Sequence, residues 1–278
     1  MLNDPLFLRT PKGVVPTARA AALAEPVADI LARVRNVVAT AEPFDPAKSR
    51  RRFMLSAPDG ASAVFLPQLL ATLRNSAPGI DLGMQQLLPA RGARTVERAW
   101  EPTLADLEAR KMDIAIIPID VIPARFASRL LFEEDFVVVT RRGHPFASKP
   151  TLDRYCDEQH LLVSASGDAF GFFDRLLADQ KRARHVAVTV PNFILALAVV
   201  AETDLLASLP RRLVTMHAAR FGVVASKLPV PHPKSLVRAV ATRAAMMDAG
   251  ISWMVDTLER VSRVALQNGS KGARQRSA

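Results

Sequence analysis

Hydrophobic residues between positions 17 and 38 recur at steps of three and four, which is the spacing of one face of an α-helix. This stripe consists of Ala20, Leu23, Val27, Ile30, Leu31, Val34, Val37 and Val38. Thr17 follows Pro16 and suits an N-cap, whereas Pro26 should kink the helix because it lacks a backbone N–H. The pattern predicts a long helix whose stripe packs either on its own domain or on a partner helix, and we favour the partner helix because a linker, 42–46, follows directly.

Beyond the linker, short apolar runs alternate with helical stretches, which is typical of an open α/β fold. The predicted strands are 53–57, 80–87, 113–119, 129–131, 136–141, 161–164, 186–190, 205–209, 223–227 and 236–242. Helices are expected between the strands, most clearly at 62–75, 170–180 and 251–266.

Two interruptions predict that the chain forms two lobes. The strand at 136–141 stops at a turn containing Gly143 and Pro145, and a proline-rich break follows at 228–233. If the chain crosses between lobes near these breaks, lobe I consists of 50–131 and 233–267, and lobe II of 132–232. This is the periplasmic-binding-protein type of fold, whose cleft is a usual place for a small ligand.

The first residues predict a β-hairpin. Leu6, Phe7 and Leu8 form an apolar run, Lys12 and Gly13 suit the turn, and apolar character resumes at Val14. A lone hairpin is only marginally stable in water, so the segment is either a frayed N-terminal arm or part of a larger structure.

Composition limits the function. With 278 residues, 49% of them hydrophobic, the chain can bury ordinary cores, and its net charge of +10 suits a polyanionic partner. Two basic blocks, 48–52 and 271–276, fall outside the predicted core. A lone cysteine, Cys156, excludes an internal disulfide and fits a reducing cytosol. We see no export leader and no apolar run that could span a membrane, so a cytoplasmic location is expected.

No arrangement of residues points to an enzyme, a cofactor or a metal. The chain has no phosphate-binding glycine loop, no nucleophile elbow, and no histidine spacing typical of metal ligands. We therefore expect no catalytic residues and no cofactor.

Binding of a small organic molecule is better supported. Four predicted turns at 56–62, 117–120, 164–168 and 190–193 follow strands, where helix N-termini offer free backbone N–H groups. The candidate ligand-binding residues are Ser56, Asp59, Gly60, Ser62, Pro118, Ser164, Ser166, Gly167, Asp168, Pro191, Asn192 and Phe193. Each of them also suits an ordinary cap or turn. Because Asp59 and Asp168 place carboxylates near helix termini, an uncharged or aromatic ligand is favoured over a dianion.

The order of several motifs resembles one family. The run from Asp4 to Thr17 resembles the wing of the winged helix-turn-helix of LysR-type transcriptional regulators, and 130–145 resembles the crossover between their lobes. The segment 207–213 and Trp253 also match the family pattern, so the resemblance covers essentially the whole chain.

This resemblance implies a wing remnant at 1–16, a linker and dimerisation helix at 17–47, and an effector-binding domain at 48–278. It places Arg9 and Lys12 near DNA phosphates and implies transcriptional control by an effector that shifts the lobes. Homo-oligomers would form through the effector domain and the linker helix, whose contact residues are Leu23, Val27, Ile30, Leu31, Val34 and Val38. Most of the DNA-reading domain is expected to be missing, which would leave DNA binding by this chain weak or absent.

Several explanations remain open at this point. The missing part of the DNA-binding domain would reflect a misplaced start codon, a decayed gene, or a short form of the protein that inhibits its full-length partners. We favour the misplaced start codon. A solute-binding protein of a transport system would use the same two lobes but should carry an export signal. The nucleotides upstream of the Met1 codon discriminate between these hypotheses.

Overall fold

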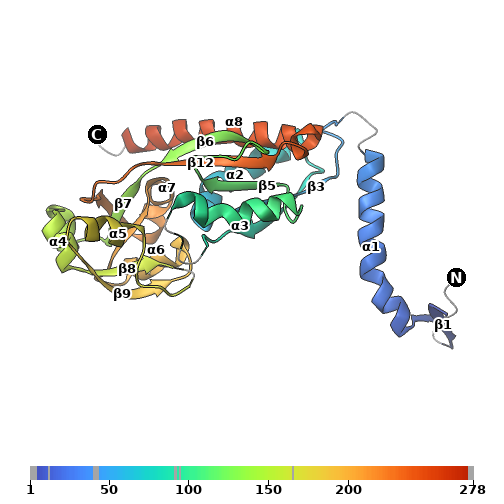
Figure 1. The fold of residues 1–278 in the computed structure, drawn as a ribbon, viewed down its shortest axis with the longest axis horizontal. Helices are drawn as coiled ribbons and strands as arrows, with labels where there is room; N and C mark the ends of the chain where they lie inside the picture. Colours follow the sequence, from blue (N-terminus) through green and yellow to red (C-terminus); the bar gives the residue numbers. More distant parts are fainter. Residues whose placement is uncertain are drawn as a thin grey trace. The chain divides into compact units, whose positions relative to one another are not determined.

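The computed structural model describes residues 5–11, 13–39, 44–90, 93, 95–164 and 166–274, without the side chains of 32–39 and 264–274 (Figure 1). The chain divides into two compact units, Met1–Asp45 and Pro46–Ala278. Most of the contacts within the chain lie in the second unit.

The first unit is a hairpin followed by a helix. Strands β1 (Phe7–Thr10) and β2 (Gly13–Pro16) pair antiparallel, and α1 spans Ala18–Ala39. Thr17 joins the two parts, because its backbone N–H donates to the Leu6 carbonyl (2.9 Å) and its Oγ1 accepts the Ala20 N–H (3.2 Å). The predicted hairpin and the predicted N-cap are both present.

One detail of the hairpin differs from the prediction. The sequence favours a turn at Lys12 and Gly13, but Gly13 pairs with Thr10 and is the first residue of β2. Its φ of +126° explains the requirement for glycine, since side chains rarely adopt that conformation. Lys12 lies outside the described residues.

The apolar stripe of α1 is open over its described part. Val27, Ile30 and Leu31 are 47%, 59% and 48% exposed, and Leu23 is half-buried. Pro26 lies inside the helix. The side chains of Val34 and Val38 lie outside the described residues. Within its own unit the described stripe therefore has little to pack against.

The second unit contains two five-stranded mixed sheets. Sheet I has the order β4-β3-β5-β12-β6, formed by Asp81–Gln86, Arg52–Ala57, Ile114–Pro118, Ser235–Thr242 and Phe126–Glu134. Sheet II has the order β11-β7-β10-β8-β9, formed by Val223–Lys227, Phe136–Arg141, Leu206–Pro210, Gln159–Val163 and His185–Val190. The two sheets correspond to the two lobes of an α/β periplasmic-binding-protein-like fold.

Helices cover both faces of sheet I. On one face α3 (Val96–Glu108) buries Trp100 and Leu104 against Ile117 of β5. On the other face α2 (Asp59–Ser76) contacts α8 (Ala249–Arg274), which follows η2 (Ala245–Met247) and also contacts β6. The nearly continuous apolar sequence of β5 follows from this double coverage.

Sheet II is covered in the same way. The first face packs on α6 (Phe193–Ala201) and α7 (Arg211–Phe221). The second face packs on η1 (Pro145–Ser148), α4 (Leu152–Asp157) and α5 (Phe172–Asp179). Leu209 faces the first group and Leu206 the second, as alternation along β10 requires.

The chain crosses twice between the sheets, first at Asp135 between β6 and β7, and again through 228–234 between β11 and β12. Most predicted elements lie within a few residues of the observed ones, but β6 is longer than the expected 129–131. It pairs with β12 along its whole length, from Phe126 to Glu134, which the short apolar run does not reveal. The last helix also extends beyond the predicted 251–266.

Candidate functional site

Asp59 connects two of the predicted turns across the two sheets. It is the first residue of α2, and its Oδ2 accepts the backbone N–H groups of Phe193 (2.8 Å) and Ile194 (3.2 Å), at the start of α6. Burial raises the pKa of the Asp59 carboxyl, although these two N–H groups lower it. The carboxylate thus occupies donors that a helix N-terminus otherwise leaves free.

Gly60 lies against the same turn. A Cβ at this position would lie 3.0 Å from Cδ2 of Phe193 and 3.6 Å from Cγ of Pro210. Any side chain here would therefore push on the Phe193 ring. The structure brings Asp59, Gly60 and Phe193 together although they are far apart in the sequence.

Other candidates in these two turns have local roles. The Asn192 side chain caps α6 by accepting the Leu195 N–H (2.8 Å), and the Ser62 hydroxyl donates to the carbonyl of Pro58, the N-cap residue of α2 (3.1 Å). Ser56 is fully buried, and its hydroxyl lies 3.5 Å from Oε1 of Gln85 on the neighbouring strand β4. Pro191 is exposed.

The turn after β8 forms its own polar chain. Ser164 and Ser166 are joined through their hydroxyls (3.3 Å), and the Ser166 hydroxyl donates to Asp168 (2.5 Å). Gly167 has a φ of +79°, which favours glycine. The Ser164 N–H donates to the Val190 carbonyl (2.8 Å), so this turn is tied to the end of β9. Asp168 is exposed.

Pro118 ends β5, where it pairs with Val237 of β12. Among the described residues, the backbone of Pro118 belongs to the β5–β12 pairing, and Pro118 forms no hydrogen bond with the other candidate residues. The candidates therefore form one contact group across the sheets, one polar turn and one separate strand end.

Residues that the sequence did not single out also join the sheets. The Arg175 guanidinium, on α5, donates to the Ala93 carbonyl in the connection after β4 (3.1 Å). Phe170 and Phe172 lie just before or at the start of α5 and remain 60% and 40% exposed. The aromatic residues Phe170 and Phe172, close after the predicted turn at 164–168, are a sequence signal that could have been followed, whereas the partner of Arg175 has no local signature.

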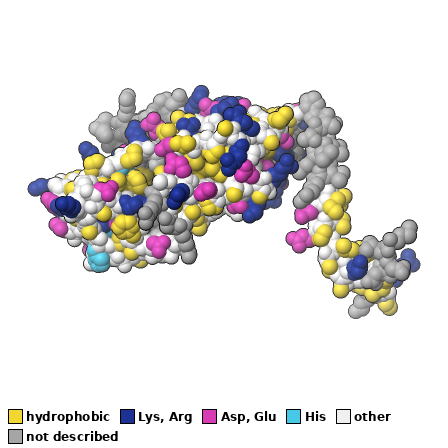
Figure 2. Space-filling model, in the orientation of Figure 1, with side chains coloured by type: hydrophobic (Ala, Val, Ile, Leu, Met, Phe, Trp, Pro, Cys, Tyr) yellow, Lys and Arg dark blue, Asp and Glu magenta, His cyan; other side chains and the backbone are white. Residues whose placement is uncertain are grey.

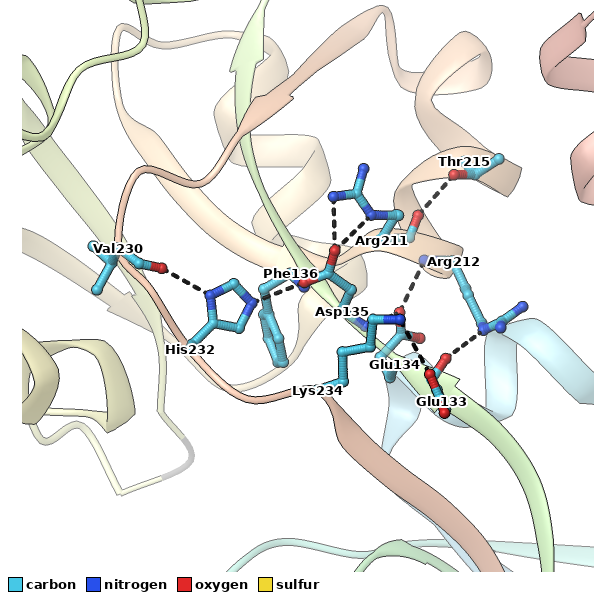
Figure 3. A network of polar contacts seen from close by, with 10 residues as sticks. All are labelled: Glu133, Glu134, Asp135, Phe136, Arg211, Arg212, Thr215, Val230, His232 and Lys234. Carbon is cyan, nitrogen blue, oxygen red and sulfur yellow. Dashed lines mark hydrogen bonds and ion pairs between the residues drawn. The ribbon is translucent and has the colours of Figure 1, made fainter.

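A network of hydrogen bonds and ion pairs joins the two segments in which the chain crosses between the sheets (Figure 3). Asp135 accepts two hydrogen bonds from Arg211 at 2.8 and 3.0 Å, and its other oxygen lies 2.8 Å from Nε2 of His232. Thus the first crossing binds both the start of α7 and the second crossing. Burial acts to raise the pKa of the Asp135 carboxyl, but the bonds from Arg211, Phe136 and His232 hold it below its usual value.

Glu134 caps α7 from the same crossing. Its Oε1 accepts the backbone N–H groups of Arg212 (3.2 Å) and Asp135 (3.1 Å), and the side chain is almost fully buried. Burial raises the pKa of the Glu134 carboxyl to about 7, although both N–H groups act to lower it. Lys234 reaches the neighbouring Glu133 carboxylate (3.1 Å), and Arg212 donates to the Glu133 carbonyl, as Figure 3 shows.

An open pocket of about 450 Å³ lies near this network, where β6, α7 and α8 meet. It is lined by Leu130, Leu131, Phe132, Glu133, Arg212, Glu259 and Arg263. None of the candidate ligand-binding residues lines it, and its charged side chains are of both signs.

Metal ligation and membrane insertion find no support in the described residues. In the part of the chain that the structure describes, no group of three His, Cys, Asp or Glu side chains could hold a metal ion. Over the same residues, no helix has the length and apolar character needed to cross a membrane.

Comparisons with known proteins agree with each other. A family model described as the LysR substrate binding domain matches residues 46–263. Similar proteins include the HTH-type transcriptional activators NahR of Pseudomonas putida, 32% identical, and NagR of Ralstonia sp, 33% identical. Each alignment covers 84% of this chain and 73% of the relative.

Solved structures of transcriptional regulators are also similar to this chain. A probable transcriptional regulator, PA0477 from Pseudomonas aeruginosa, is 30% identical with a TM-score of 0.72, over 93% of this chain and 82% of that one. The regulatory domain of the transcriptional activator MexT from Pseudomonas aeruginosa is 25% identical with a TM-score of 0.65, over 77% of this chain and all of that one.

Proposed function

This chain belongs to the LysR family of transcriptional regulators and carries the family's substrate-binding domain, and from this premise we propose that a small-molecule effector binds between its two sheets. The binding residues would be those of the turns at 56–62, 164–168 and 190–193, together with Pro118. The observation that carries the proposal is the contact of Asp59 and Gly60 with Phe193, where turns from the two sheets meet.

We propose that the effector is uncharged or aromatic. The Asp59 carboxylate already accepts the first two N–H groups of α6, so those donors are not free for an anion, and its own charge repels one. Phe193, Phe170 and Phe172 offer aromatic rings on or near the same turns. Ring stacking supports binding of an aromatic ligand.

The effector would act by favouring one arrangement of the lobes. Two contacts, Asp59 with α6 and Arg175 with Ala93, join the sheets away from the crossings. A ligand seated between the turns changes the populations only if it binds one arrangement more tightly than another. Lobe movement would then pass to the rest of the regulator through the crossings held by Asp135.

Calorimetric titration of neutral aromatic compounds and simple dicarboxylates into the chain tests this proposal. For an aromatic ligand that binds the wild type, Phe193→Ala should weaken binding by about tenfold, the effect of losing about 1.4 kcal/mol of contact. Leu195→Ala, on the exposed side of the same helix, is the matched control and should bind normally. Tight binding of a dicarboxylate with none of the neutral aromatics would contradict the proposed effector class.

The remaining functional assignments are proposals of the same kind. Arg9 on β1 is exposed and would contact DNA phosphates, with Lys12 beside it in sequence. The stripe of α1 would form a homo-oligomer. The relatives are transcriptional regulators, and we propose that this chain likewise works in the cytoplasm without catalysing a reaction.

A further inference from the structure

One end of sheet I gathers the starts of four strands and the end of the fifth. Strands β3, β4 and β5 run parallel, with Arg52 opposite Asp81 and Leu55 opposite Ile114. β12 runs against β5, and its last residue pairs with the first residue of β6. The connections that enter these strands must therefore lie at the same end, which we call the basic pole.

Basic side chains are concentrated at this pole. They come from the segment leading into β3, the last turn of α2, the connection before β5, the start of β6 and the end of β12. They are Lys48, Arg50, Arg51, Arg52, Arg74, Arg110, Lys111, Arg125 and Arg243. On the face drawn in Figure 2, dark-blue side chains gather toward this end of the second unit.

The acidic residues of the pole are mostly engaged in other contacts. Asp248 caps the start of α8 and pairs with Arg51 (2.6 Å). Asp106 pairs with Lys111, Glu108 pairs with Arg125, and Asp113 accepts the Met54 N–H (2.8 Å). Asp81, opposite Arg52 in the strand register, is exposed and forms no ion pair among the described residues, so one carboxylate of the pole stays available to its arginines.

Several arginines at the pole carry uncompensated charge. Among the described residues, Arg50, Arg52, Arg74 and Arg110 are exposed and take part in no ion pair. By contrast, the residues from 132 to 232, which contain sheet II, hold twelve basic and eleven acidic side chains. The excess of positive charge in the second unit therefore lies outside the residues that contain sheet II.

We propose that the basic pole contacts the phosphate backbone of double-stranded DNA without reading its sequence. Exposed guanidinium groups bind phosphate in pairs of hydrogen bonds, and several of them together give affinity that depends on salt. The chain also enters the second unit at this pole, at Pro46. The residues of the pole are not those of the proposed effector-binding turns, which follow the opposite ends of β3 and β5.

Binding of the full chain to a duplex DNA of random sequence, followed by fluorescence anisotropy from 50 to 200 mM salt without effector, tests the proposal. The test variant is Arg50→Gln/Arg52→Gln/Arg110→Gln. The matched control removes three exposed basic groups of sheet II and α7, Arg142→Gln/Arg220→Gln/Lys227→Gln. Arg9→Gln, alone and in the test background, measures the wing separately, and thermal unfolding confirms that each variant is folded.

The test variant should bind about tenfold more weakly at low salt, and the slope of log affinity against log salt should fall by about one unit for each arginine lost. The sheet II control should keep the affinity and slope of the wild type. An unchanged slope in the test variant, or an equal loss in the control, overturns the proposal. If the variant loses binding to poly-glutamate but keeps its DNA binding, the pole serves an acidic protein partner, which also overturns it.

Discussion

Single side chains at the first crossing hold together parts of the chain that are far apart. Asp135 joins Arg211 at the start of α7 to His232 in the second crossing. Glu134 next to it caps the same helix, whose own N-cap residue, Pro210, has no side-chain donor or acceptor. The Glu134 carboxylate and the Asp135 backbone carbonyl, which accepts the Arg211 N–H (2.8 Å), thus replace the capping side chain that α7 lacks.

Glu134 should make stability depend on pH. Its folded pKa of about 7 lies above the unfolded value of 4.5, so the folded state holds an extra proton between these two pH values. Stability should therefore fall as pH rises from about 4.5 to about 7, by up to about 3 kcal/mol. Glu134→Gln removes this charge, so the variant should be more stable than the wild type at pH 8, with the difference shrinking toward pH 5.

Urea unfolding across this pH range measures the effect. Glu133→Gln is the control, because the side chain of the neighbouring Glu133 is 53% exposed and its ion pair is with the exposed Lys234. That substitution should change stability by less than about 1 kcal/mol at any pH. A difference between wild type and Glu134→Gln that stays constant from pH 5 to 8 would show that the carboxyl does not titrate as described.

At the scale of elements, one buried ion pair fixes the second face of sheet II. Arg184, which precedes β9, binds both oxygens of Asp174 on α5 (2.8 and 3.0 Å) and has no exposed side-chain surface. It also donates to the Tyr155 hydroxyl on α4 (2.6 Å), which contacts Ser208 on β10. A single guanidinium therefore joins two helices to the sheet.

Removing one partner should be costly, because the other charge would stay buried and unpaired. We expect Asp174→Asn to lower the free energy of unfolding by about 3–5 kcal/mol, measured in urea. The exposed pair of Asp153 with Arg182 gives the control, since the Asp153 side chain is 76% exposed. Asp153→Asn should cost less than about 1 kcal/mol, and equal losses in the two variants would contradict the role of burial.

Helices and strands could be predicted from the sequence where turn residues mark their ends. Strands at 136–141 and 223–227 have the predicted bounds, because apolar runs ended by turn residues mark them on both sides. The strand β6 was underestimated because its two ends, 126–128 and 132–134, are defined by pairing with β12. Pairing between distant segments leaves no local pattern.

At the scale of the molecule, we expect the exposed apolar stripe of α1 to pack against a partner helix. Ile30 is the most exposed of its described large apolar residues, at 59%. If the stripe forms a helix pair, Ile30→Glu should place a charge in an apolar contact and dissociate the oligomer, because burying an unpaired charge is unfavourable. Analytical ultracentrifugation of the full chain should show a lower mass for this variant.

Arg19→Glu, which alters the charged face of the same helix, should leave the mass of the oligomer unchanged. The circular dichroism of both variants should match the wild type, since the second unit has its own cores. An Ile30→Glu variant that keeps the wild-type mass would mean that the chain associates through another surface.

The sequence alone determined the α/β fold, the hairpin, the long helix and the family, because periodicity, turn residues and ordered motifs are local properties. It also named Asp59, Gly60 and Phe193, but only as members of separate turns. The tertiary structure decided that Asp59 caps α6 across the sheets, that Asn192 and Ser62 serve local hydrogen bonds, and that Glu134 and Asp135 hold the crossings. Such contacts depend on which segments the folded chain brings within hydrogen-bonding distance, and no local spacing encodes that distance.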